Sequence, residues 1–141
     1  MRAGEHSDYG SLTLLFQEEG SSGLEILNRQ KEWIPVIPCK PDVIVNLGDL
    51  MERWTNGRWL STLHRVNIPE SKTAQNQSRM SLAFFQLPDW NASIEALPTC
   101  VEYDKTSKYP VLTSGKHLME RFHSTVLNEP QFITKREHRQ T

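Results

Sequence analysis

Residues 5–15 read EHSDYGSLTLL, in which a histidine and an aspartate two positions apart precede an apolar run. Positions i and i+2 of an extended segment project to the same side. His6 and Asp8 can therefore offer two metal ligands from one strand end. The apolar run at 12–16 predicts the first of several β-strands, so this stretch links the expected fold to the expected chemistry.

Short β-like runs separated by turn residues continue from this stretch to residue 87. The chain has 141 residues, about one domain's worth. Pro35 cannot donate a ladder hydrogen bond, which predicts an edge or bent strand for its run. Several short strands at roughly even spacing are typical of an antiparallel sandwich or jelly roll. The runs lie at 12–16, 24–27, 33–36, 42–47, 60–68 and 79–87.

Two helices are expected beside these strands. One is a short helix near 48–55. The other is a C-terminal helix near 114–128, where apolar residues recur every four positions. The sequence therefore predicts one mainly β domain over 1–128, followed by a polar tail at 129–141.

The sequence pattern also predicts the surroundings of four further side chains. His117 and His123 are six positions apart on the C-terminal helix and are expected at its surface or rim. Phe84 and Phe85 alternate faces in a predicted strand, so we expect one to join the core and the other to approach a pocket.

Composition and charge exclude several classes of protein. Sixteen Lys and Arg against 17 Asp and Glu give a formal charge of −1, so no nucleic-acid surface is indicated. The apolar runs are too short to span a membrane. No secretory signal is visible, and Cys39 and Cys100 lack a cysteine partner at metal-binding spacing. An intracellular, cytoplasmic location is expected.

A third candidate ligand, His64, lies in the β-like run that a jelly roll can place beside His6 and Asp8. Two histidines and one carboxylate suit a first-row divalent ion and leave coordination positions open for substrate and oxygen. A jelly-roll binding protein with a structural metal is the weaker alternative, because closed structural sites usually use four protein ligands.

Arg79 and Ser81 also stand at i and i+2, among the apolar residues of the last predicted strand. A guanidinium pointing into a β-sandwich is costly unless an anion meets it. A carboxylate is its best partner, bound through two hydrogen bonds. The pair therefore indicates binding of an organic acid, with an internal salt bridge as the alternative.

Together these motifs resemble the isopenicillin N synthase-like iron(II)- and 2-oxoglutarate-dependent dioxygenases. The resemblance is dense over residues 3–90 and looser to about 128. The matching motifs, in order and spacing, are EHSDYGSLTLL at 5–15, GLEI at 23–26, WIPV at 33–36, VNLGD at 45–49, WTNG at 54–57, STLHRV at 61–66 and RMS at 79–81.

The resemblance implies a double-stranded β-helix, a distorted jelly roll, with Fe(II), 2-oxoglutarate and O2 as cofactor and co-substrates. His6, Asp8 and His64 would bind the iron, and Arg79 and Ser81 the distal carboxylate of 2-oxoglutarate. The implied reaction couples decarboxylation of 2-oxoglutarate to succinate with hydroxylation or a related oxidation of a small organic substrate. The segment 46–49 is expected to support the metal-binding strands.

Two departures from the family pattern qualify these expectations. Family members carry a long region before the His-x-Asp strand, so we expect the N-terminal portion of the parent enzyme to complete the fold. The chain alone is then expected to be marginally stable or aggregation-prone. A truncated, non-catalytic remnant that binds a ligand or partner is the alternative. Moreover, a few relatives keep the Arg-x-Ser pair without using 2-oxoglutarate.

Overall fold

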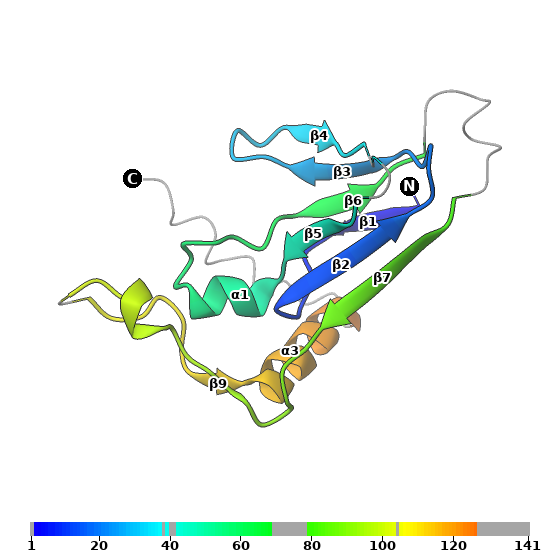
Figure 1. Ribbon diagram of the computed structural model, residues 1–141. Coiled ribbons are helices and arrows are strands. Elements are labelled where there is room, and N and C mark those ends of the chain that lie inside the picture. Colours follow the sequence, from blue (N-terminus) through cyan, green and yellow to red (C-terminus); the bar gives the residue numbers. More distant parts are fainter. Residues whose placement is uncertain (1, 38, 40–41, 69–78, 104, 127–141) are drawn as a thin grey trace.

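The computed structural model describes residues 2–37, 39, 42–68, 79–103 and 105–126, and Figure 1 shows its elements. The expected tail at 129–141, the last two residues of the expected C-terminal helix and the polar segment 70–78 lie outside the described residues. No helix in the described ranges is both long enough and apolar enough to cross a lipid bilayer.

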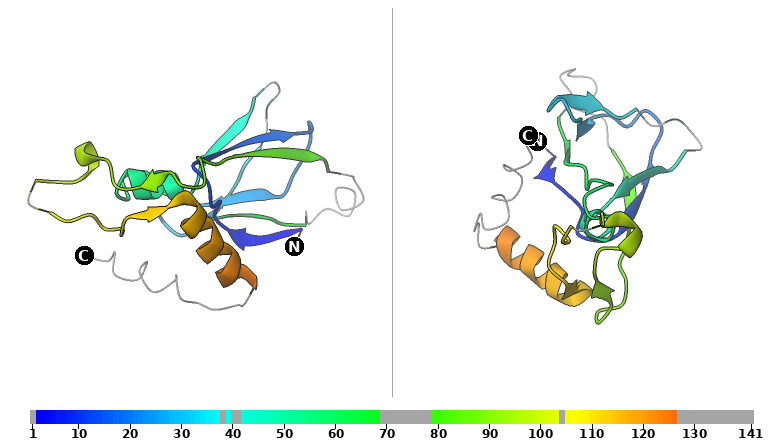
Figure 2. Two further views of the ribbon diagram at one scale, coloured as in Figure 1. Left: turned by 90° about the horizontal axis from the view of Figure 1, so that it is seen from below. Right: turned by 90° about the vertical axis from the view of Figure 1, so that its left-hand side faces the viewer.

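Most strands belong to two antiparallel sheets that face each other as the walls of an open barrel (Figure 2). The first sheet has the order β1 (Ala3–His6), β6 (His64–Val66), β3 (Leu24–Leu27), β4 (Trp33–Pro35). The second has the order β5 (Ile44–Leu47), β2 (Leu12–Gln17), β7 (Ser81–Gln86). A two-stranded sheet joins β8 (Ser93–Ile94) and β9 (Leu112–Thr113).

The chain crosses between the two large sheets at nearly every connection, and only the β3–β4 hairpin stays within one sheet. This alternation is the winding of a double-stranded β-helix, so the predicted fold class is confirmed. Strand β4 lies at the edge of its sheet. The expectation from Pro35 is therefore also confirmed.

Helix α1 (Asp49–Trp54) and helix α3 (Ser114–Val126) confirm the two predicted helices, and a short 3-10 helix, η1 (Pro98–Cys100), was not predicted. The strand predicted at 60–68 is shorter, and Ser61 at its start bonds outside the ladder. The Ser61 amide donates to the buried Glu52 carboxylate at 2.8 Å. A side-chain acceptor thus replaces a strand partner there.

The start of α1 packs directly on the connection between β1 and β2. The Asp49 amide donates to the Asp8 carbonyl at 2.8 Å, and the Leu50 amide donates to the Gly10 carbonyl at 3.0 Å. A Cβ at Gly48 would stand 2.3 Å from the Gly10 carbonyl oxygen. Glycine at position 48 therefore permits this close approach, which fixes the backbone just after Asp8.

The buried apolar core of the described residues is small and lies outside the two large sheets, where α1 meets β8 and β9. Leu50, Ile94 and Leu112 form its contiguous cluster, with Trp54 packed against them, and Leu24 of β3 is buried outside this cluster. The two aromatic residues of β7 do not join it: Phe84 is 53% exposed and Phe85 is 56% exposed. The expectation of a core phenylalanine is wrong, because β7 is an edge strand and alternation of faces does not ensure that either face is covered.

One face of the β5–β2–β7 sheet carries exposed apolar side chains. The cross-strand pairs Phe16–Leu82 and Leu14–Phe84, together with Val45 opposite Leu14, lie on this face. Phe16, Val45, Leu82 and Phe84 are all exposed. A contiguous apolar face of this kind favours association of one molecule with another.

We expect the chain alone to have a free energy of unfolding below about 5 kcal/mol and to self-associate as its concentration rises. Urea denaturation followed by circular dichroism, with analytical ultracentrifugation, measures both properties. The double variant Leu82→Thr/Phe84→Thr should reduce association without lowering stability, because both side chains face solvent. A cooperative, concentration-independent monomer of ordinary stability would contradict this prediction.

Candidate metal centre and anion pocket

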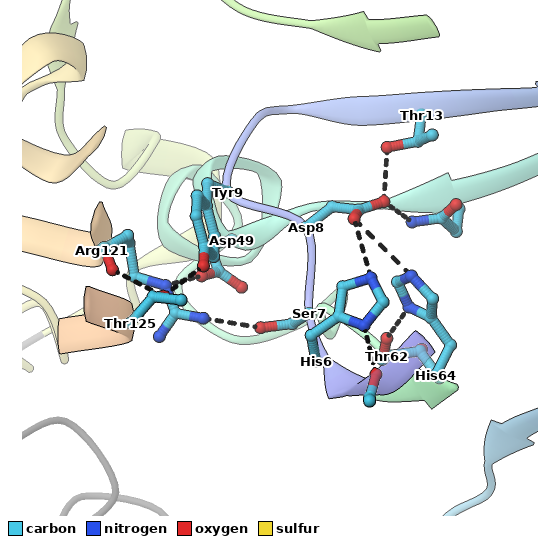
Figure 3. A network of polar contacts seen from close by, with 12 residues as sticks. His6, Ser7, Asp8, Tyr9, Thr13, Asp49, Thr62, His64, Arg121 and Thr125 are labelled. Atoms are coloured by element: carbon cyan, nitrogen blue, oxygen red, sulfur yellow. Dashed lines mark hydrogen bonds and ion pairs between the residues drawn. The ribbon is translucent and has the colours of Figure 1, made fainter. Parts of the chain in front are cut away.

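The structure brings His6, Asp8 and His64 together, although they come from the end of β1, the connection after it and the start of β6 (Figure 3). One ligand atom from each side chain lies within 4.8 Å of the others. His64 Nε2 is 3.6 Å from Asp8 Oδ1, and His6 Nε2 is 4.0 Å from the same oxygen. The pairing of His6 with His64 across β1 and β6 produces this arrangement.

Both imidazoles are oriented by a backbone carbonyl. His6 Nδ1 donates to the Gly4 carbonyl at 2.7 Å, and His64 Nδ1 donates to the Thr62 carbonyl at 3.1 Å. A histidine whose Nδ1 proton is held in this way has its Nε2 lone pair available to a metal. Both Nε2 atoms face Asp8, so the lone pairs of both imidazoles point toward the same carboxylate oxygen.

The Asp8 carboxylate is held in one orientation by two polar side chains. Its Oδ2 accepts hydrogen bonds from the Thr13 hydroxyl at 2.5 Å and from Asn46 Nδ2 at 2.7 Å. Its Oδ1 is the oxygen that faces the two histidines. Asp8 therefore presents a single oxygen to the centre, as a carboxylate ligand with one coordinating atom would.

The exposure of the three side chains differs across the centre. The Asp8 side chain is 6% exposed and that of His64 is 14% exposed, whereas His6 is 43% exposed. Solvent therefore reaches this cluster mainly at His6. Three ligands on one face with an open opposite side can bind a metal ion together with further small molecules.

Arg79 and Ser81 lie together at the start of β7. Arg79 donates from a terminal guanidinium nitrogen to the Ser81 hydroxyl at 3.1 Å, while its Nε is buried without a hydrogen-bond partner. Burial lowers the pKa of Arg79, and the nearby charge of Arg2 acts in the same direction. The ion pairs among the described residues do not include Arg79, so the alternative of an internal salt bridge finds no support there.

Gln17 is a third polar residue at this end of β7, and the sequence did not reveal it. It stands directly opposite Ser81 across β2 and β7, and both polar atoms of its amide are buried without a partner. A buried guanidinium nitrogen and a buried amide that lack partners are costly in a folded protein unless a ligand meets them. We call Gln17, Arg79 and Ser81 the anion pocket, because their donors can bind a carboxylate.

The two side chains that hold Asp8, Thr13 and Asn46, lie on the same face of the β5–β2–β7 sheet as the anion pocket. Thr13, which holds Asp8, and Gln17 are four residues apart on β2 and so point to the same side. Four residues of a strand span roughly 13 Å. The residues that hold Asp8 and the anion pocket thus stand at opposite ends of one face of β2.

His117 is not a surface residue, contrary to the sequence prediction, whereas His123 is exposed as expected. His117 is 4% exposed, and its Nε2 lies 3.8 Å from Asp49 Oδ2. Burial lowers the pKa of His117 to about 4, with Arg53 and Arg121 acting in the same direction and Asp49 opposing them. The prediction was wrong because a polar helix residue can be buried where a helix packs on another charged element.

The buried His117 makes stability depend on pH. In the unfolded chain it takes up a proton near pH 6.5, whereas in the folded chain it does so only near pH 4. Its contribution is therefore fully present above pH 6.5 and is lost as the pH falls below that value, by about 2 kcal/mol at pH 5.

Thermal or urea denaturation at pH 7 and pH 5 tests this expectation. The variant His117→Gln should lose less stability between the two pH values than the unaltered chain does. Asp49, Arg53 and Arg121 also face this site and remain in both proteins, so the difference isolates the imidazole. Equal losses in the two proteins would show that His117 does not titrate in this way.

A jelly roll that places two histidines and one carboxylate around an open position has the ligand arrangement of non-haem iron(II) oxygenases. The sequence pattern of the 2OG-Fe(II) oxygenase superfamily matches residues 1–88. The chain belongs to this superfamily.

Individual relatives agree with this assignment. The 2-oxoglutarate-dependent dioxygenase htyE of Aspergillus rugulosus is 40% identical over 84% of this chain and 36% of its own length. A full-length Neurospora crassa protein, solved in complex with alpha-KG, has a TM-score of 0.77 and 40% identity over 88% of this chain and 37% of its own. A 2OG-Fe(II) oxygenase family protein from Caulobacter crescentus has a TM-score of 0.78 and 34% identity over 88% of this chain and 40% of its own. The chain thus spans well under half the length of these relatives.

Proposed function

We propose that this chain carries the catalytic centre of an iron(II)- and 2-oxoglutarate-dependent dioxygenase that oxidises a small organic substrate. His6, Asp8 and His64 are the iron ligands in this proposal. The observation that supports it most is the convergence of three ligand atoms within 4.8 Å, with each imidazole already oriented by a carbonyl. Bound iron with 2-oxoglutarate and O2 would supply the oxidative chemistry and release succinate.

Arg79, Ser81 and Gln17 bind the distal carboxylate of 2-oxoglutarate in this proposal. The buried, unpartnered Nε of Arg79 and amide of Gln17 support it, because each has an unsatisfied donor. Ser81 is already hydrogen-bonded to Arg79, so the hydroxyl and the guanidinium are held together before a ligand arrives. This pre-formed geometry would orient the co-substrate along the sheet, with its other end toward the metal.

The protein's part in the reaction is to orient and to shield. Thr13 and Asn46 keep one Asp8 oxygen turned away from the metal, so that a single carboxylate oxygen coordinates. The carbonyls of residues 4 and 62 keep both histidines in the tautomer that binds metal. The open side beside His6 is where a substrate can approach.

Two further parts of the proposal concern the parent protein. Its N-terminal portion would cover the open apolar face of the β5–β2–β7 sheet, an idea that the exposure of Leu82 and Phe84 supports. A cytoplasmic location agrees with the free thiols of Cys39 and Cys100. The alternative function, a non-catalytic remnant that binds a ligand or partner, predicts no succinate formation even where metal binds.

The variant His64→Ala should bind Fe(II) at least about 100-fold more weakly than the unaltered chain, because it loses a direct ligand. Anaerobic titration measures the affinity, and succinate formation from 2-oxoglutarate measures turnover. His123→Ala, which alters an exposed histidine on α3, should leave both unchanged. Undiminished metal binding by His64→Ala would exclude the proposed centre.

The variant Arg79→Ala should retain Fe(II) but bind 2-oxoglutarate roughly 30-fold more weakly, since a lost charged hydrogen bond costs about 2 kcal/mol. Titration of the iron-loaded protein with 2-oxoglutarate measures this. Arg29→Ala removes an exposed arginine from the β3–β4 turn and serves as the control. An unchanged affinity in Arg79→Ala would assign the arginine another role and leave the identity of the co-substrate open.

A further inference from the structure

Arg121 on α3 reaches the segment that carries two of the three candidate ligands (Figure 3). A terminal guanidinium nitrogen donates to the Ser7 hydroxyl at 3.2 Å, and the guanidinium carbon lies 4.7 Å from the centre of the Tyr9 ring. Arg121 Nε lies 3.1 Å from Asp49 Oδ2, an ion pair between α3 and α1. One side chain thus contacts three residues that come from two other parts of the chain.

The three residues that Arg121 contacts are all linked to Asp8, two as its neighbours in sequence and one through a backbone hydrogen bond. Ser7 precedes Asp8 and Tyr9 follows it, while the Asp49 amide donates to the Asp8 carbonyl at 2.8 Å. Arg121 therefore touches the residue on either side of the central ligand and the residue that bonds its backbone.

The segment from residue 7 to residue 9 needs such support. It follows the end of β1, after an irregularity in the pairing of β1 with β6, and lies in no sheet ladder. Ser7 is 2% exposed, so its hydroxyl depends on a protein partner rather than on water. Tyr9 is also tied to α3 through its hydroxyl, 2.6 Å from the Thr125 hydroxyl, and through an edge contact with Phe122.

Arg121 also balances the negative charge of Asp49. This carboxylate is largely buried, with its side chain 13% exposed, and its other neighbour His117 is neutral at pH 7 because burial lowers the pKa of that imidazole. Arg121 is the cation in ion-pair contact with it in the described chain, although Arg53 is within electrostatic range. Loss of Arg121 would leave a buried carboxylate poorly compensated next to the Asp8 backbone.

We infer that Arg121 is a positioning residue for the metal centre: it fixes residues 7–9 so that the ligand atoms of His6 and Asp8 face His64. The inference rests on the proposed function, because it takes those side chains as ligands. It makes the C-terminal helix part of the metal centre without placing any α3 atom on the metal.

The test uses Co(II) as the probe ion, with its visible absorption as the measurement of affinity and ligand geometry. Arg121→Met should bind Co(II) about 10-fold more weakly than the unaltered chain, the range expected when support behind a ligand is removed. Arg121→Lys keeps the charge for Asp49 but not the planar fork that also reaches Ser7, so its affinity should be intermediate. Lys116→Met removes an exposed cation from the same helix and should bind as the unaltered chain does.

A double-mutant cycle separates positioning from general loss of stability. Ser7→Ala removes one hydrogen bond from a small side chain, worth about 1 kcal/mol or roughly five-fold in affinity. Its effect should disappear in the background of Arg121→Met, because the two residues act through one contact. If Arg121→Met fails to fold, Ser7→Ala, paired with Arg121→Lys, decides the matter in the same way.

The outcomes distinguish this inference from the proposed function. Co(II) affinity and spectrum that are unchanged in Arg121→Met, or effects of the two substitutions that simply add, would overturn the positioning role alone. An unaltered chain that binds no Co(II) through His64 would overturn the proposed centre, and the positioning role with it. Weaker binding, an altered spectrum and non-additive effects would support the inference.

Discussion

The orientation of one carboxylate determines what this site can do. Asp8 has its Oδ2 held by Thr13 from β2 and by Asn46 from β5, and its carbonyl held by the start of α1. The remaining oxygen can only face the histidines of the other sheet. Both sheets and a helix thus converge on a single residue.

The anion pocket contains more hydrogen-bond donors than the protein offers acceptors for. Arg79 and Gln17 have buried donors without protein acceptors, at the far end of the sheet face that carries Thr13. A fold that keeps such groups unsatisfied gives up stability that a hydrophobic pair would not. Such a cost is typical of a position kept for binding rather than for stability.

Much of this arrangement could be predicted from the sequence, but only where local spacing determines geometry. His6 and Asp8 share a side because they are two residues apart, and β-like runs with turns indicated the jelly roll. Thr13 and Gln17 were missed because their importance depends on the register of β2 against β5 and β7, which no local pattern specifies. The metal and co-substrate roles of the predicted residues remain predictions.

The two errors have a common physical cause. His117 was expected at the surface and Phe84 was a candidate for the core, yet the histidine is buried and the phenylalanine is exposed. In each case the sequence showed the polarity of the residue, but it did not show which helix or strand, if any, packs over that residue. Burial depends on which elements pack together, as α3 does on α1, and helical or strand periodicity alone does not reveal this.

The winding of the chain between two sheets has a consequence for assembly. His6 and His64 meet only when the first described strand pairs with the sixth, a closure of a long loop whose entropic cost must be met before any ligand can chelate. An ion bound between them would act as a non-covalent cross-link across that loop. Bound metal would therefore slow the separation of β1 from β6.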